Sequence, residues 1–146
     1  MGEKFKFSLD KLLEIRREKE EESKRLFTES QREKRKIEEK LNNLNDNYNK
    51  YKGVSGNDDV VYQKLKRYYI LGLEKGIKSA EDELVAKGFE VDKRRRELVN
   101  KQIERKTVES LRTKKYNAFI KEQERIEQIT LDELALYAYI RNGDGV

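Results

Sequence analysis

The side chains that could do chemistry are almost all carboxylates, amines and guanidinium groups. The chain has 146 residues, with 29 acidic and 34 basic ones but neither His nor Cys. It therefore lacks the commonest general base, the thiol nucleophile and the usual nitrogen and sulfur ligands of metals. Its carboxylates lie in mixed-charge runs such as residues 16–22, which are typical of solvated helix faces. We expect no catalytic residue, no metal site and no cofactor.

The most basic stretch is residues 93–115, where ten basic residues stand against three acidic ones, a net charge of +7. The rest of the chain has a net charge of −2. The cluster favours an acidic partner, either a protein ring or a nucleic acid. A solvated helix face explains it equally well. Nucleic acid is the weakest interpretation, because no aromatic or glycine-rich recognition module accompanies the charge.

Tyrosines gather on either side of a glycine-containing segment at residues 53–58. Five of the eight tyrosines in the chain lie there, namely Tyr48, Tyr51, Tyr62, Tyr68 and Tyr69. They could widen a helix–helix interface, or they could form a contact site, because tyrosine is rigid and amphipathic. Both interpretations stay open.

Helices must position these groups. Five aliphatic residues follow one another at intervals of seven in a chain without proline: Ile70, Ile77, Leu84, Val91 and Leu98. Such a repeat predicts a helix paired with another helix in a left-handed coiled coil. The interleaved positions begin with Leu73 and Ala80 and then become basic. We expect the strict pattern to fail at Arg105 and Arg112.

From Leu9 to Tyr51, positions alternately three and four residues apart form one helix face, which is apolar at its ends and polar in its middle. This face predicts a second helix. Ser8 is the expected N-cap. Gly53 and Gly56 end the pattern. The composition, 43% charged and 35% hydrophobic, would also suit a disordered chain, but the apolar heptads argue against disorder.

We therefore predict an all-α fold, a two-helix antiparallel coiled-coil hairpin with a longer second helix, in a single domain over residues 1–146. The first helix should cover about residues 8–52, the loop about 53–58 and the second helix about 59–141. With Lys52 opposite Asp58, paired residue numbers sum to about 110. This register places Leu44 near Lys66 and Ser30 near Ala80, and it leaves the residues after about 103 without a partner helix. No apolar run suggests a membrane span, so a cytoplasmic location is expected.

Three features of the sequence resemble the FliJ family, a coiled-coil component of the bacterial flagellar type III export apparatus. Residues 5–16 read FKFSLDKLLEIR, similar to the start of many members. The chain also has a shorter helix, a loop near residue 55 and a longer helix. Residues 69–77 read YILGLEKGI, which resembles the family's aromatic-x-x-x-Leu-Glu-Lys-small-Ile segment.

The resemblance implies a non-enzymatic partner of the hexameric flagellar export ATPase, with the hairpin's open end entering the ring like the stalk of a rotary ATP synthase. It also implies contact with the cytoplasmic domain of the membrane export gate, and members handle export chaperones. The protein would then lie in the cytoplasm, peripheral at the cytoplasmic face of the cell membrane.

Site residues follow from matching positions. The implied gate contacts are Leu44, Tyr51, Tyr69, Leu73 and Gly76. This sequence departs from the family pattern at Gly76, where alanine is expected, at Asn47, where tyrosine is expected, and at Ala80, where histidine is expected. Resemblance and charge together give Arg94, Arg95, Arg105 and Arg112 as the ATPase-ring contacts. The alternative function is a generic coiled-coil scaffold or tether.

The predicted hairpin has a hydrodynamic consequence. Two long helices joined by one interior loop should give an elongated, almost wholly helical molecule, so its frictional ratio should be well above that of a compact protein of the same mass. Sedimentation velocity measures this ratio directly. A value typical of a compact 17.5 kDa protein would contradict the hairpin.

Overall fold

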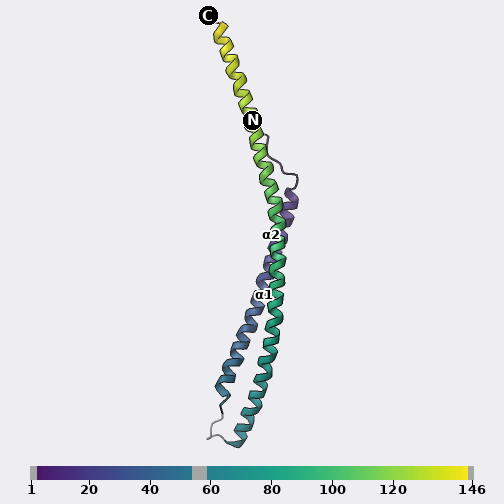
Figure 1. Ribbon diagram of the computed structural model, residues 1–146, viewed down its shortest axis with the longest axis vertical. Coiled ribbons are helices and arrows are strands. Elements are labelled where there is room, and N and C mark those ends of the chain that lie inside the picture. The colour runs from purple at the N-terminus through teal and green to yellow at the C-terminus, as the bar shows by residue number, and fades with distance from the viewer. Residues whose placement is uncertain (1–2, 54–58, 145–146) are drawn as a thin grey trace. The chain divides into compact units, whose positions relative to one another are not determined.

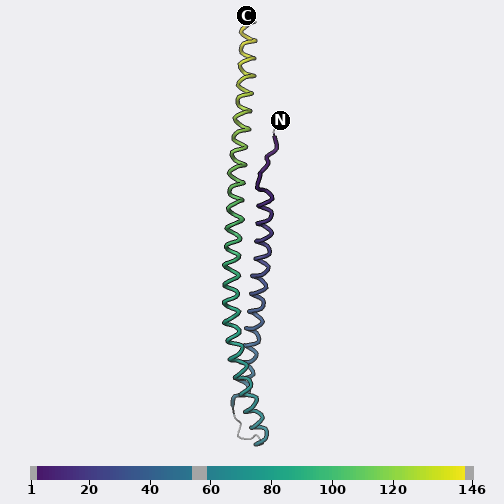
Figure 2. The backbone as a smooth tube through the Cα atoms, turned by 90° about the vertical axis from the view of Figure 1, so that its right-hand side faces the viewer, coloured from purple at the N-terminus to yellow at the C-terminus, as the bar shows by residue number. Residues whose placement is uncertain are grey.

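The computed structural model describes residues 3–53 and 59–144, and two helices account for nearly all of them. Helix α1 spans Asp10–Tyr51 and has 42 residues, and helix α2 spans Val60–Asp144 and has 85. The described residues contain no strand. The two helices pack against each other, and both views show them running side by side (Figures 1 and 2). The predicted all-α hairpin with a longer second helix is confirmed.

The helix ends lie close to the predicted positions. The first α-helical hydrogen bond of α1 runs from the Leu13 amide to the Leu9 carbonyl, at 2.9 Å, so α1 starts two residues after the Ser8 cap that the sequence predicts. Asp10 in the first turn adds a favourable negative charge at the helix N-terminus. Most of the predicted loop, residues 54–58, lies outside the described residues.

The chain divides into two compact units, Lys19–Lys101 and a second unit made of Met1–Glu18 and Gln102–Val146. In the unit Lys19–Lys101, the predicted frames of both helices are the faces that turn inward. Small and aliphatic side chains are the most buried there: Ser23, Ser30, Leu73, Ala80 and Val91. Because the buried stripe is narrow, most of the surface of each helix is exposed to solvent, as the high charge content predicts.

The predicted register is wrong. Leu44 does not oppose Lys66; its Cδ1 atom lies 3.7 Å from the position of a Cβ on Gly76. Lys87 Nζ pairs with a Glu33 carboxylate oxygen at 2.9 Å. Each of these pairs sums to 120, so α2 is displaced by about ten residues, or nearly three turns, relative to the prediction.

The physical reason lies at the start of α2. Because Tyr51, the last residue of α1, packs edge to face against Tyr69, the first nine residues of α2, 60–68, lie beyond the end of α1. The chain leaving α1 stays beside them, since Lys66 Nζ donates a hydrogen bond to the Gly53 carbonyl. The connection between the helices, residues 52–59, is therefore longer than the loop of about residues 53–58 that the glycines predicted.

In the other unit, an apolar cluster joins the N-terminal segment to both helices. Phe7, Leu13 and Val108 are buried, with Leu13 only 2% exposed, and Phe5 and Leu12 pack against them. The Phe5 ring also meets Tyr116 and Phe119, with ring centroids 5.2 and 5.6 Å apart. The non-helical residues before Asp10 thus cover α2 as far as Phe119.

This coverage corrects two expectations. The part of α2 without a partner does not begin near residue 103; continuous exposure begins at residue 124. The heptad frame also does not fail at Arg105 and Arg112. Both are half-buried at frame positions, on either side of the buried Val108. Arginine is tolerated there because its stem packs against apolar neighbours while its head reaches a carboxylate.

The cluster around Leu13 should be the largest local source of stability. Replacing Leu13 by Ala removes a fully enclosed side chain, so the free energy of unfolding should fall by about 2–4 kcal/mol. Ile15→Ala is the matched control, because Ile15 is 38% exposed on the same helix and should cost well under half as much. Urea unfolding followed by circular dichroism compares the two. Equal losses would show that the cluster is not a core.

Candidate functional site

The five residues implied as one contact site lie together near the end of the hairpin, within the unit Lys19–Lys101. Tyr51 and Tyr69 form an edge-to-face pair, with ring centroids 5.4 Å apart and an interplanar angle of 85°. Leu73 is 6% exposed and belongs to the interface between the helices. Leu44 packs against Gly76. The two tyrosines therefore cap an interface that the other three residues build.

Exposure separates these five residues by role. Tyr69 is 46% exposed and can meet a partner directly, whereas Leu73 cannot do so without the helices parting. Lys50 Nζ lies 5.3 Å from the centroid of the Tyr51 ring, which adds positive charge beside the pair. A partner could therefore contact Tyr69 directly, whereas Leu73 would act only through the packing of the two helices.

A groove that the sequence did not reveal runs beside Tyr51. Its volume is about 280 Å³, and it is lined by Tyr51, Lys52, Gln63, Lys66, Arg67, Ile70, Leu71 and Glu74. Its lining combines two aliphatic side chains, Ile70 and Leu71, with three basic side chains and one acidic one. The sequence did not predict this groove because the predicted register was wrong. Lys66 and Arg67 come next to Tyr51 only because α2 extends beyond the end of α1.

The two glycines of this part of α2 have different surroundings. A Cβ on Gly76 would make ordinary van der Waals contact with Leu44 of α1, and a Cβ on Gly72 would meet nothing within 4 Å. Gly76 therefore faces the first helix, and Gly72 leaves an open place on the surface. Alanine fits at both positions.

The four arginines implied as a second contact site are divided between the two units, two in each. In the unit Lys19–Lys101, Arg94 pairs with Glu97 and Arg95 with Asp92, each at 3.1 Å. The Arg95 guanidinium also lies over the Phe27 ring, 5.6 Å from its centroid. Each arginine thus already has a carboxylate of its own helix as a partner.

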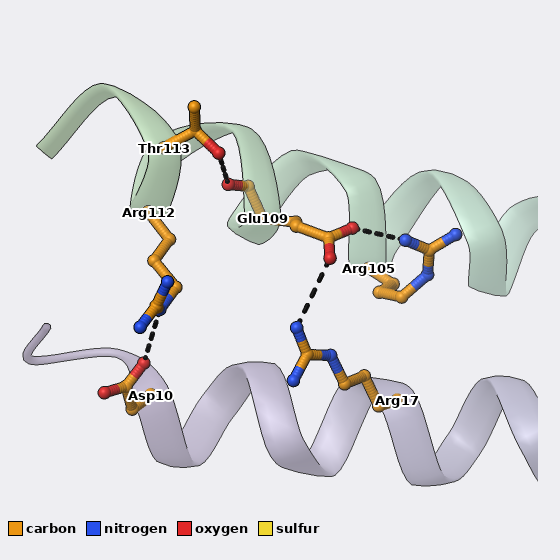
Figure 3. Close-up of polar contacts among 6 residues, drawn as sticks. All are labelled: Asp10, Arg17, Arg105, Glu109, Arg112 and Thr113. Atoms are coloured by element: carbon orange, nitrogen blue, oxygen red, sulfur yellow. Dashed lines mark hydrogen bonds and ion pairs between the residues drawn. The ribbon is translucent and has the colours of Figure 1, made fainter. Parts of the chain in front are cut away.

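The other two arginines belong to the unit that contains the N-terminal segment. Arg105 pairs with Glu109, and Arg112 Nε donates to Asp10 Oδ1 at 3.1 Å (Figure 3). The Arg112 guanidinium also lies 5.5 Å from the centroid of the Phe5 ring. The Arg112 contacts fasten the start of α1 and the N-terminal segment to α2, whereas the Arg105–Glu109 pair lies within α2.

Other basic side chains of residues 93–115 are better placed to meet a partner. Five of them are exposed: Lys93, Arg96, Lys106, Lys114 and Lys115. The heptad frame would have separated Lys93, Arg96, Lys106 and Lys114 from the arginines at frame positions, Arg94, Arg105 and Arg112, which are half-buried. Lys115 also stands at a frame position but is exposed.

Glu109 joins three side chains into one polar network. It accepts a hydrogen bond from Arg17 of α1 at 3.3 Å and pairs with Arg105 of its own helix, while its carbonyl accepts from Thr113 at 3.1 Å (Figure 3). Partial burial alone would raise the pKa of Glu109, but the hydrogen bond from Arg17 and the charge of Arg105 outweigh it, so the pKa is lowered. The network therefore favours the ionised carboxylate.

Two kinds of site do not occur in the part of the chain that the structure describes. No three acidic side chains there come together in a group that could hold a metal ion. None of its helices combines the length and the apolar character needed to cross a membrane.

Comparison with known families gives one match. The family model described as FliJ, Flagellar FliJ protein, matches residues 5–144, nearly the whole chain. Neither a curated protein nor a solved structure matches the sequence.

The Glu109 network predicts a pH-dependent contribution to stability. Because folding lowers its pKa, Glu109 stabilises the fold above the pKa of an unfolded glutamate, about 4.3, and this contribution disappears as the pH falls below that value. Glu109→Gln should therefore lower the free energy of unfolding at pH 7, by at most about 1 kcal/mol because the ion pair is exposed. At pH 3 the variant and the parent should be equally stable.

Urea unfolding at the two pH values tests this expectation. Glu124→Gln serves as the control, because Glu124 is an exposed carboxylate on the same helix, and it should have no effect at either pH. A loss of the same size at pH 7 and pH 3 for Glu109→Gln would rule out the ionised network as its cause.

Proposed function

The chain belongs to the FliJ family of non-enzymatic flagellar export components, and we propose that it links the export ATPase ring to the export gate. In this proposal the hairpin end contacts the cytoplasmic domain of the gate protein. The basic part of α2 contacts the hexameric ATPase. The protein acts at the cytoplasmic face of the cell membrane and assists export of flagellar proteins, including those held by export chaperones.

The observation that carries the gate contact is the aromatic pair on a packed platform, in which Tyr69 is 46% exposed and Tyr51 is half-buried. Tyr51 and Tyr69 already hold each other in an edge-to-face geometry, so a partner need not order them. The neighbouring groove adds aliphatic and basic side chains beside the pair. Such a combination is common at the centres of protein interfaces, where aromatic residues provide much of the binding free energy.

The ring contact rests on charge. Residues 93–115 carry a net charge of +7, and five of the cations among them are exposed and can face an acidic surface. Arg94, Arg95, Arg105 and Arg112 contribute to the positive potential but are held by carboxylates of this chain. The exposed cations are thus the stronger candidates for direct contact.

A generic tether is the competing function. It would need the same helices but no specific surface at either end. The arrangement of Tyr51, Tyr69 and the basic groove beside them favours a dedicated contact, because solvated helix ends rarely gather three tyrosine or aliphatic side chains with cations around a groove.

Co-purification with the export ATPase and with the gate's cytoplasmic domain tests both contacts at once. Tyr69→Ala should weaken gate binding about tenfold or more, as expected for an aromatic residue at the centre of an interface, and leave ATPase binding unchanged. Changing Arg96, Lys106 and Lys114 together to Glu should do the reverse, and this loss should grow smaller as salt rises. The same outcome is expected for Arg94, Arg95, Arg105 and Arg112 changed to Glu, provided the helices stay folded.

Phe89→Ala is the matched control for Tyr69→Ala. Phe89 is an aromatic residue of α2 that is 72% exposed and lies outside both proposed contacts, so its loss should affect neither partner. A folded Tyr69→Ala variant that binds the gate normally would refute the gate contact. Normal ATPase binding by both charge-reversed variants would return residues 93–115 to the interpretation as a solvated face.

A further inference from the structure

The last part of α2 carries an apolar stripe that no part of the described chain covers. The heptad frame that begins at Ile70 continues in the same spacing to the end of the helix. Its last five positions, here called the terminal stripe, are Ile126, Ile129, Glu133, Leu136 and Ile140. The terminal stripe is therefore the continuation of the face that, nearer the N-terminal segment, packs through Val108 and Phe119.

Every residue from 124 to 143 is exposed, and the end of α2 stands clear of other elements of its unit (Figure 1). The four apolar members of the terminal stripe are between 44% and 58% exposed. Tyr137, at 66%, flanks them on the same side. An apolar face of this length on one helix indicates an absent partner, since isolated apolar side chains are normal on surfaces but an aligned row is not.

Charge identifies the kind of partner. From Ile126 to Ile140 the helix has three carboxylates, on Glu127, Asp132 and Glu133, and no basic residue. Along the helix, Glu133 is the middle member of the terminal stripe, between Ile129 and Leu136, and at 100° per residue it lies between Ile126 and Ile140 around the helix axis. A partner that covers the stripe removes this carboxylate from water, which is costly unless a cation pairs with it.

The same chain already shows how such a position is satisfied. Lys87 occupies another position of the same frame, nearer the loop, where it is 29% exposed and pairs across the helix interface with Glu33 at 2.9 Å. The hydrogen bond to Glu33 raises the pKa of Lys87, so the pair keeps both charges. A helix that continues this interface over Glu133 would need the opposite arrangement, with its own cation facing the carboxylate.

Two other occupants fit poorly. A second copy of the chain would place Glu133 against its own counterpart in a parallel pair, or against aliphatic side chains such as Ile129 in an antiparallel one. An anionic membrane surface would be repelled by three carboxylates with no compensating cation between residues 126 and 140.

We propose that the terminal stripe binds a basic amphipathic helix of another protein, which lays its apolar face on Ile126, Ile129, Leu136 and Ile140 and pairs Lys or Arg with Glu133. The terminal stripe is acidic, whereas residues 93–115, assigned to the ATPase ring, are basic. The two assignments are therefore independent, and an experiment can refute one without refuting the other. It gives the end of α2 a partner of defined chemistry.

Two synthetic helices of identical apolar pattern test the proposal, one flanked by lysines and the other by glutamates. Fluorescence anisotropy measures their binding to the full-length chain. The lysine helix should bind, and the glutamate helix should bind at least about tenfold more weakly, as expected for loss of a charge-assisted pair. Glu133→Lys should reverse this preference, which a merely apolar contact cannot do.

Two exposed leucines of the same helix provide matched variants. Leu136→Asp, within the stripe, should abolish binding of the lysine helix, and Leu131→Asp, on the opposite face, should leave it unchanged; circular dichroism confirms that both remain helical. Equal affinity for the two synthetic helices, or binding that survives Leu136→Asp, would overturn the proposal. If sedimentation equilibrium shows self-association and Leu136→Asp removes it, the stripe binds a second copy of the chain. If the chain binds anionic vesicles and Leu136→Asp removes that binding, the stripe binds a membrane. Either result would also overturn the proposal.

Discussion

The register between α1 and α2 is the constraint on which the other features depend. Both helices bury only a narrow stripe, so a shift of one helix along the other changes which side chains meet without changing which faces are used. Leu44 lies at Gly76 and Lys87 pairs with Glu33. In this register Tyr51 and Tyr69 pack edge to face, and a groove lies beside Tyr51. In the other unit, Asp10 reaches Arg112 and Arg16 donates to the Glu104 carbonyl at 2.8 Å. The exposed length of α2 follows from where these contacts end.

The fold class could be read from periodicity, but the register could not. The repeat from Ile70 to Leu98 and the spacing from Leu9 to Tyr51 determine the faces, and both faces are the ones that pack. The middle of α1 is polar or small at Arg16, Ser23 and Ser30, so several registers bury similar amounts of apolar surface. The deciding contacts are local: the Tyr51–Tyr69 pair at one end of α1, and Phe5 and Phe7 on α2 at the other. A non-helical segment that packs through two phenylalanines leaves no periodic signal.

The candidate sites were predicted unequally well. Resemblance grouped Leu44, Tyr51, Tyr69, Leu73 and Gly76, and these residues do lie together, although their part in binding remains a proposal. Resemblance and charge together grouped Arg94, Arg95, Arg105 and Arg112, and each of them pairs with a carboxylate of its own chain; their part in binding also remains a proposal. Composition counts charges but not their partners, and it could not show that these four arginines have carboxylates beside them. The frame position of each arginine carries more information than its membership of a basic run.

Cysteine crosslinking measures the register most directly, because the chain has no cysteine of its own. Disulfides need Cα atoms within about 7 Å, so only residues that face each other across the interface can form one. The double variant Leu44→Cys, Gly76→Cys should close a disulfide on mild oxidation, and Leu44→Cys, Lys66→Cys should stay reduced. A disulfide between positions 44 and 66, with none between 44 and 76, would contradict the register and with it the surfaces built on it.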